Sequence, residues 1–192
     1  MKTYRTRVGA TAVLVSLVSL APLASLGSAA HAGPSVPWVQ AWGHNGAGQL
    51  GNGSTLDQQT PTSVRGLARG HVRELAGGGY NSTIAFAVAL LRDGTVQTWG
   101  GNSDGQLGDG TRASRPHPAA VAGLSGVTEV AAGGYFAYAV RSGRVLAWGD
   151  NASGQLGNGT TTASPTPVMA LPPGSGTTRV AASTSWTSSY AY

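Results

Sequence analysis

Cysteine is absent from this chain of 192 residues, so neither a disulfide nor a thiolate metal site can stabilise the fold. Charged residues make up only 10% of the sequence, and lysine occurs once, at Lys2. Long stretches of helix-forming residues are also missing, which argues against a helical protein. Glycine, in contrast, occurs 30 times, which is about twice its usual share. This composition is typical of an all-β fold with many tight turns.

The N-terminal segment has the pattern of a secretory signal peptide. Basic residues come first, a largely apolar run covers residues 8–26, and Ala30-His31-Ala32 fits an A-x-A cleavage signal. The apolar run contains serines and Pro22, which make it a poor permanent membrane span. We therefore expect a signal peptide over residues 1–32, export, and a mature domain over residues 33–192. An uncleaved anchor is the alternative.

Most of the excess positive charge belongs to this leader. Three of the twelve basic residues precede residue 33, so residues 33–192 hold nine arginines against seven acidic residues, a net charge of +2. These arginines are scattered rather than gathered in a basic stripe. The sequence therefore predicts no nucleic-acid partner.

A twelve-residue motif, W-G-x-N-x-x-G-Q-L-G-x-G, occurs three times, starting at Trp42, Trp99 and Trp148. The copies are 57 and 49 residues apart, a period that indicates stacked supersecondary units. The same repetition argues against an enzyme, because no site within the repeats is unique.

Each residue type of the motif has a structural interpretation. The glycine after tryptophan allows a turn where a Cβ would clash, asparagine and glutamine satisfy backbone groups of the loop, and leucine packs into the core. Tryptophan is expected between neighbouring units, where it would bury a large apolar area. The structural positions are Trp42, Gly43, Asn45, Gly48, Gln49, Leu50, Gly51, Trp99, Gly100, Asn102, Gly105, Gln106, Leu107, Gly108, Trp148, Gly149, Asn151, Gly154, Gln155, Leu156 and Gly157.

The sequence between the motifs predicts four short strands per unit. Eight residues after each motif stands a proline, at Pro61, Pro118 and Pro167, which suits an edge strand. Two strand-like runs follow, and then a hairpin turn, Asp93-Gly94 or Ser142-Gly143, before the strand that leads to the tryptophan. Four antiparallel strands in about 50 residues describe a propeller blade. A stacked β-solenoid is the competing interpretation.

The motif, followed by P-x-x-V-x-G-L and V-x-x-V-A-A-G-G, closely resembles the regulator of chromosome condensation repeat. The resemblance covers essentially all of residues 33–192 and implies a seven-bladed β-propeller fold. It divides the chain into a partial repeat (33–60), two repeats (61–110 and 111–159) and a second partial repeat (160–192). The family's eukaryotic activity is nucleotide exchange on a nuclear GTPase. An exported protein would not meet that partner, so the resemblance does not imply this activity here. Together with the leader, the resemblance suggests a secreted bacterial member.

The sequence departs from the family pattern in three ways. Asn81, Phe136 and Trp186 stand near the place of the histidine that usually follows the tandem glycines. The segment from Tyr80 to Gly94 is six residues longer than its counterpart from Tyr135 to Gly143. The repeats account for only about three blades.

Three blades leave two open apolar faces, whereas a closed propeller needs at least four. The N-terminal strand, Val39 to Trp42, could complete the last blade. A three-blade arc cannot bend far enough to close on itself, but two copies could form a six-bladed homodimer. Truncation of a longer propeller is the interpretation that the open edges favour, and the homodimer and an open arc are the alternatives.

The sequence offers little catalytic chemistry. The histidines after the leader, His44, His71 and His117, have no metal-binding spacing, and Asp104 and Asp109 are not repeated in the other motifs as a calcium site would require. No paired carboxylates, nucleophile elbow or phosphate loop can be assigned. We therefore expect no catalytic residue, no cofactor and no metal.

The favoured function is a secreted, non-enzymatic scaffold that binds an extracellular protein through the loops between each motif and its proline. Arg112, Arg115 and His117 form the one locally basic loop and are the candidate partner contacts. A carbohydrate- or cell-wall-binding module that uses Trp38 and Trp186 is the alternative. A propeller lyase or hydrolase is less favoured.

Overall fold

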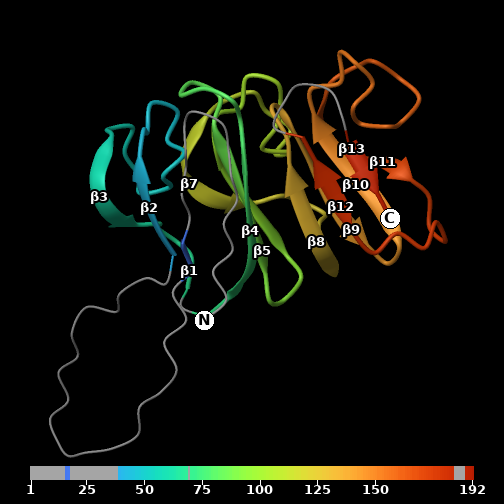
Figure 1. Cartoon of the computed structure of the whole chain (residues 1–192), viewed down its shortest axis with the longest axis horizontal. Helices are drawn as coiled ribbons and strands as arrows, with labels where there is room; N and C mark the ends of the chain where they lie inside the picture. Colours follow the sequence, from blue (N-terminus) through green and yellow to red (C-terminus); the bar gives the residue numbers. More distant parts are fainter. Residues whose placement is uncertain (1–15, 18–38, 69, 184–188) are drawn as a thin grey trace, which may run out of the picture.

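The computed structural model describes residues 16–17, 39–68, 70–183 and 189–192. The predicted leader, apart from residues 16–17, lies outside the described residues, as do Trp38 and Trp186. All regular elements of the described residues are β-strands, arranged as sheets that follow one another in chain order (Figure 1). These sheets confirm the all-β, partial propeller architecture.

Two sheets are complete four-stranded antiparallel blades. The first full blade contains β4 (Val72–Gly78), β5 (Phe86–Leu91), β6 (Val96–Gly100) and β7 (Arg115–Ala120). The second full blade contains β8 (Val127–Ala132), β9 (Phe136–Arg141), β10 (Arg144–Gly149) and β11 (Ser164–Leu171). In both blades the strands are in sequence order, and the tryptophan of the motif lies on the third strand.

A half-blade flanks this pair on each side. The leading half-blade consists of β2 (Val39–Gly43) and β3 (Gln58–Ser63), which match the third and fourth strands of a full blade. The trailing half-blade consists of β12 (Val180–Ala182) and β13 (Ser189–Ala191), which match the first and second strands. The two half-blades therefore contain complementary halves of one blade. A two-residue strand, β1 (Ser16–Leu17), pairs with β2 on the edge where a second strand would lie.

Apolar layers between consecutive sheets form the core. Trp99 anchors the layer between the leading half-blade and the first full blade, together with Leu50 and Val64. Trp148 and Leu107 occupy the same places between the two full blades. Strand β5 is buried along its whole length and carries alanines at alternate positions, because it contacts a neighbouring sheet on each face.

The connections follow the turn chemistry of the sequence. Ser142 and Gly143 both adopt positive φ, 51° and 72°, as a tight hairpin between β9 and β10 requires. Most of the expansion between Tyr80 and Gly94 forms a turn before β5, which is closed by a hydrogen bond from the Ala85 N–H to the Asn81 carbonyl (3.1 Å). This turn touches the leading half-blade, since Gln49 Nε2 donates to the Ser82 carbonyl (3.2 Å).

Candidate functional site

The asparagine of each motif fixes the loop that follows the motif. In the first full blade, Asn102 Nδ2 donates to the carbonyls of Thr111 (3.2 Å) and Ala113 (3.0 Å), which lie nine and eleven residues ahead. Its Oδ1 accepts the Leu107 N–H at 2.9 Å. The side chain is only 1% exposed, so one buried amide joins both ends of the motif to the loop.

The same clamp recurs in the other two copies. Asn45 Nδ2 donates to the carbonyls of Ser54 (2.9 Å) and Leu56 (3.0 Å). Asn151 Nδ2 donates to those of Thr160 (2.9 Å) and Thr162 (3.0 Å). Because the contacts reach backbone oxygens, the loop sequences can differ while the loop shape stays the same. Three loops, residues 52–57, 109–114 and 158–163, are therefore held in one pose; we call them the clamped rim.

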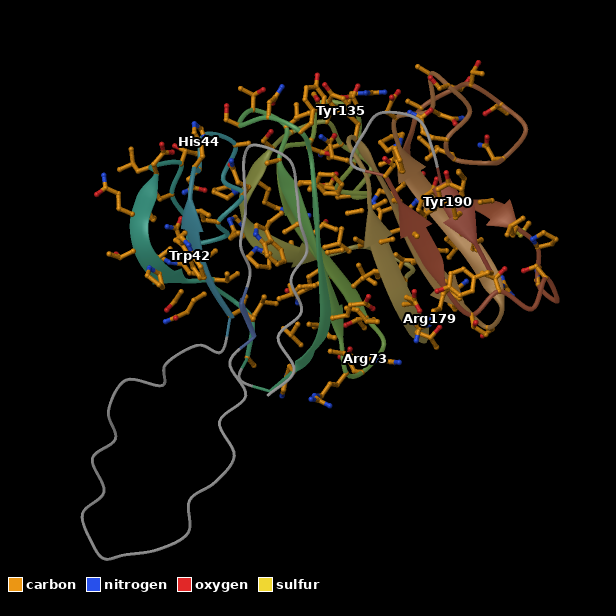
Figure 2. The ribbon with its side chains drawn as sticks, in the orientation of Figure 1. Trp42, His44, Arg73, Tyr135, Arg179 and Tyr190 are labelled. Atoms are coloured by element: carbon orange, nitrogen blue, oxygen red, sulfur yellow. The ribbon has the colours of Figure 1, made fainter. Side chains whose placement is uncertain are left out.

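The clamped rim presents different side chains at equivalent places. Leu56 is 72% exposed, and its counterparts in the other two loops, Ala113 and Thr162, are also exposed. The preceding residue of each loop is exposed as well, and there the second loop carries Arg112. Figure 2 shows His44 and Tyr135 at the same end of the strands as these loops, and Arg73 and Arg179 at the opposite end. The rim is thus a set of variable groups on a uniform support.

The glutamine of each motif stabilises its own turn. Its Oε1 accepts the N–H of the residue two positions earlier: Ala47 for Gln49 (2.8 Å), Asp104 for Gln106 (2.9 Å) and Ser153 for Gln155 (2.8 Å). The motif leucines are fully buried below these turns. The structure therefore places this part of the motif in the scaffold rather than at the surface.

Tryptophan joins each blade to the motif of the blade before it. Trp99 Nε1 donates to the Gln49 carbonyl, and Trp148 Nε1 to the Gln106 carbonyl, both at 2.9 Å. A Cβ on Gly51 would lie 2.7 Å from the Trp99 ring nitrogen, and one on Gly108 would lie 2.8 Å from the Trp148 ring. Only glycine lets the indole rest on the loop backbone. We call this contact an indole joint.

The third copy of the joint differs from the first two. Trp99 and Trp148 are at most 1% exposed, whereas Trp42 is only partly buried. Gly157, the counterpart of Gly51 and Gly108, is exposed. The expectation that all three tryptophans lie between blades therefore holds for two of them within the described residues.

The three candidate partner contacts have different environments. Arg115 forms an ion pair with Asp109 (3.2 Å) and donates to the Thr98 carbonyl (3.3 Å), with 18% of its side chain exposed. It therefore braces its own blade and cannot serve a partner without breaking these contacts. Arg112 and His117 remain at the surface, and Arg112 Nη1 donates to the Ser103 carbonyl (2.9 Å).

Asp109 is tied into the same network. Burial alone would raise the pKa of its carboxyl, but hydrogen bonds from Thr111 and the charge of Arg115 outweigh burial and lower the pKa. The carboxylate thus stays charged beside the Asn102 amide, which donates to it at 3.3 Å. Asp109 is part of the clamp and not a general acid.

Two glutamates link neighbouring inner strands. The Val130 N–H donates to Glu74 Oε2 (3.4 Å), and the Val180 N–H donates to Glu129 Oε1 (3.2 Å). Burial raises the pKa of Glu74 above its ordinary value, although the Val130 N–H and nearby arginines act in the opposite direction. The folded chain therefore disfavours the charged form of the Glu74 carboxyl, relative to the same group in the unfolded chain.

Replacing this carboxyl with an amide should stabilise the chain at neutral pH. The folded state binds the Glu74 proton more tightly than the unfolded state, so stability falls as pH rises from near the ordinary value of 4.5. Glu74→Gln keeps an acceptor for Val130 but removes the titration. We expect a flatter profile of urea midpoint against pH from 4 to 8. Parallel profiles for the variant and the unchanged chain would contradict this assignment.

The described residues contain no group of three or more His, Asp or Glu side chains that could hold a metal ion. Within the same residues, no helix is long and apolar enough to cross a membrane. Tyr80 and Tyr135 form a hydroxyl–hydroxyl hydrogen bond (2.6 Å) with their rings edge to face, so they support each other between the two full blades.

Sequence reasoning did not single out Leu56, the exposed large hydrophobic residue of the rim. A leucine in a polar loop between a glycine-rich motif and an edge strand is a weak signal by itself. It could have been found by noting that the loop lies at the same distance from each motif, where the other copies carry Ala113 and Thr162.

Family models agree with the repeat. The model for the regulator of chromosome condensation (RCC1) repeat matches residues 39–85, 93–140 and 142–188. A second model with the same description matches residues 74–106 and 127–155. These stretches include all three copies of the motif.

Two curated proteins are similar to about half of this chain. The chain is 39% identical over 97 residues to human E3 ubiquitin-protein ligase HERC2, covering 50% of the chain but 2% of that protein. It is 32% identical over 104 residues to the ultraviolet-B receptor UVR8 of Arabidopsis thaliana, covering 53% of the chain and 22% of that protein.

Among solved structures, Prp20p from Saccharomyces cerevisiae aligns with a TM-score of 0.65 and 19% identity, covering 76% of this chain and 37% of that one. Human WBSCR16 aligns with a TM-score of 0.61 and 23% identity, covering 74% and 38%. The chain thus spans less than two thirds of these proteins, and the solved structures show the fold alone. Because the repeat model matches more than half of its residues, the chain belongs to the regulator of chromosome condensation repeat family.

Proposed function

We propose that this chain is a secreted, non-enzymatic scaffold that binds an extracellular protein through the clamped rim. The observation that carries the proposal is the clamp itself, in which one buried amide per repeat holds a loop by its backbone. Such loops can change side chains without changing shape, which is the property that a recognition surface needs.

Preorganisation gives this surface an energetic advantage. Ordering a loop upon binding costs free energy for each side chain and backbone segment that becomes fixed. The clamp hydrogen bonds hold the rim loops before a partner arrives. Leu56 then supplies exposed apolar area, and Arg112 supplies a charge of the kind enriched at interface hot spots.

The fold neighbours support a binding role. Prp20p, which shares the fold, has reported binding properties to Gsp1p and histones. The propeller in such proteins is a binding or regulatory module, and HERC2, a ligase, is far longer than the part that this chain matches. For this chain, the leader pattern directs the proposal to partners outside the cell.

A comparison of immobilised baits tests the proposal. The rim variant combines Leu56→Ala with Arg112→Ala. The control variant combines Met169→Ala with Arg73→Ala, which also removes one exposed apolar side chain and one arginine, but away from the rim. Proteins retained from culture medium and cell-surface extract are quantified by mass spectrometry.

We expect at least one retained protein to fall by about tenfold or more with the rim variant and to be kept by the control, as hot-spot truncation predicts. The proposal fails if every retained protein binds the rim variant and the unchanged bait equally. It also fails if the control variant loses the same proteins.

A further inference from the structure

The third copy of the indole joint contains no indole from the described residues. We call the open site beside Gln155 and Gly157 the socket. A Cβ on Gly157 would have only the Ala170 Cβ nearby, at 3.7 Å, whereas Gly51 and Gly108 are pressed against tryptophan rings. A cavity of about 260 Å³ lies at this place, lined by Tyr138, Gln155, Leu156, Gly157, Val180 and Tyr190 among others. The apolar layer here contains no tryptophan, unlike the other two layers.

The first two motifs also contact the outer strand of the next blade, and the third motif makes no such contact within the described residues. The Gly53 N–H donates to the Pro116 carbonyl (2.8 Å) of the next outer strand, and the Gly110 N–H donates to that of Pro165 (2.9 Å). Gly48 and Gly105 pack against the same two prolines. Their counterpart in the third motif, Gly154, has nothing closer than 3.9 Å. Within the described residues, the third motif therefore lacks the contacts with a following blade that the first two motifs make.

The group that fits this socket lies at the other end of the same chain. Trp42 is the motif tryptophan that is only partly buried, and Figure 2 shows it on β2, at the opposite end of the molecule from Tyr190. Its sheet, β2–β3, is the outer half of a blade, and β12–β13 is the inner half. The two surfaces complement each other, but they point away from each other within one copy.

We propose that Trp42 of a second copy fills the indole joint formed by Gln155 and Gly157, and that β2 of that copy pairs with β13. Two copies exchange this contact reciprocally, which closes a head-to-tail ring of two full blades and one shared blade from each copy. The Trp42 ring nitrogen then donates to the Gln155 carbonyl. Tyr138 already donates its hydroxyl to that oxygen, and a carbonyl with two lone pairs can accept both.

Strand equivalence fixes the register of the shared blade. Tyr138 on β9 pairs with Ala131 on β8 and Ala147 on β10. Tyr190 takes the place of Tyr138, since it pairs with Ala181. Ala41 takes the place of Ala147, because each precedes a motif tryptophan by one residue. The second copy therefore sets Ala41 opposite Tyr190.

Strand β1 occupies the edge that this pairing needs. Ser16 pairs with Gln40 and Leu17 with Val39, on the side of β2 where Ala191 and Tyr192 of a second copy would lie. The leader and the second copy therefore compete for one edge. Removal of the leader should strengthen association between copies.

The contact is tested by measuring association between copies. The protein is purified as its host processes it, and its mass shows where its N-terminus lies. Native mass spectrometry and light scattering measure the dimer over a dilution series. Trp42→Ala removes the indole that would enter the socket, and Gly157→Ala places a methyl group in the socket. Gly123→Ala is the matched control, because Gly123 also has positive φ and open space for a Cβ but lies in the turn between the two full blades, away from the proposed contact.

We expect a dimer whose dissociation constant rises about tenfold or more in Trp42→Ala and in Gly157→Ala, and stays unchanged in Gly123→Ala. An equimolar mixture of the two weakened variants should regain association, because one joint of the mixed pair has both an intact Trp42 and an intact Gly157. That recovery also shows that both variants are folded.

Three results would overturn the proposal: a monomer at every concentration, a dimer that neither variant weakens, or no recovery in the mixture. A larger oligomer that both variants dissolve would support the joint and reject the two-copy ring.

Discussion

Replacing Trp148 with alanine should lower the free energy of unfolding by about 3–5 kcal/mol, the usual cost of deleting a buried large aromatic side chain. The side chain is fully buried between the two full blades and contributes to their shared apolar layer. Its loss also leaves the Gln106 carbonyl without the indole N–H, which adds the cost of an unpaired buried acceptor. Urea denaturation followed by far-UV circular dichroism measures the change.

The same substitution at Trp42 provides the contrast. Trp42 is partly exposed in a single copy, so Trp42→Ala should cost on the order of 1 kcal/mol when the protein is dilute enough to be monomeric. Trp99→Ala should resemble Trp148→Ala, because Trp99 forms the equivalent joint. Equal losses at all three positions would contradict the assignment of two filled joints and one open joint.

The repeated motif was enough to predict the blades. A tryptophan that recurs with a glycine after it, a proline at a fixed distance and a hairpin turn between apolar runs define strand order and strand number without further information. The observed order of β4–β7 and β8–β11 follows directly from those local signals. The leading half-blade also followed, because Val39 to Trp42 matches the strand that leads to the tryptophan in the other units.

The site depended on contacts that local patterns do not encode. The sequence predicts that Asn102 satisfies nearby backbone groups, and its Oδ1 does so within the motif. It does not predict that the amide nitrogen holds carbonyls nine and eleven residues ahead, in a loop that must first fold back. Arg115 was grouped with Arg112 by sequence proximity, yet β7 turns its side chain toward Asp109 and Thr98. Arg112 belongs to the clamped loop whereas Arg115 is the first residue of β7, so proximity in sequence says little about a shared surface.

Changing Asn102 to aspartate should be the most damaging conservative substitution in the clamp. Asn102→Asp keeps an oxygen for the Leu107 N–H but replaces the donor that serves Thr111 and Ala113. A carboxylate there faces backbone carbonyls and the Asp109 carboxylate, which the amide contacts at 3.3 Å. An unpaired buried polar group costs about 1–3 kcal/mol, and more when it is charged. We therefore expect a loss of roughly 3 kcal/mol or more at pH 7.

The sign of the pH dependence separates charge repulsion from a simple loss of packing. Burial and the Asp109 charge would raise the pKa of the new carboxyl in the folded chain, so the folded state would bind its proton more tightly than the unfolded state. The deficit of Asn102→Asp should therefore shrink as pH falls from 7 to 5, while that of Asn102→Ala, which adds no titratable group, should stay constant relative to the unchanged chain. Urea midpoints at both pH values decide this. A pH-dependent deficit in the aspartate variant alone would assign the loss of stability to the charge that replaces this single amide donor.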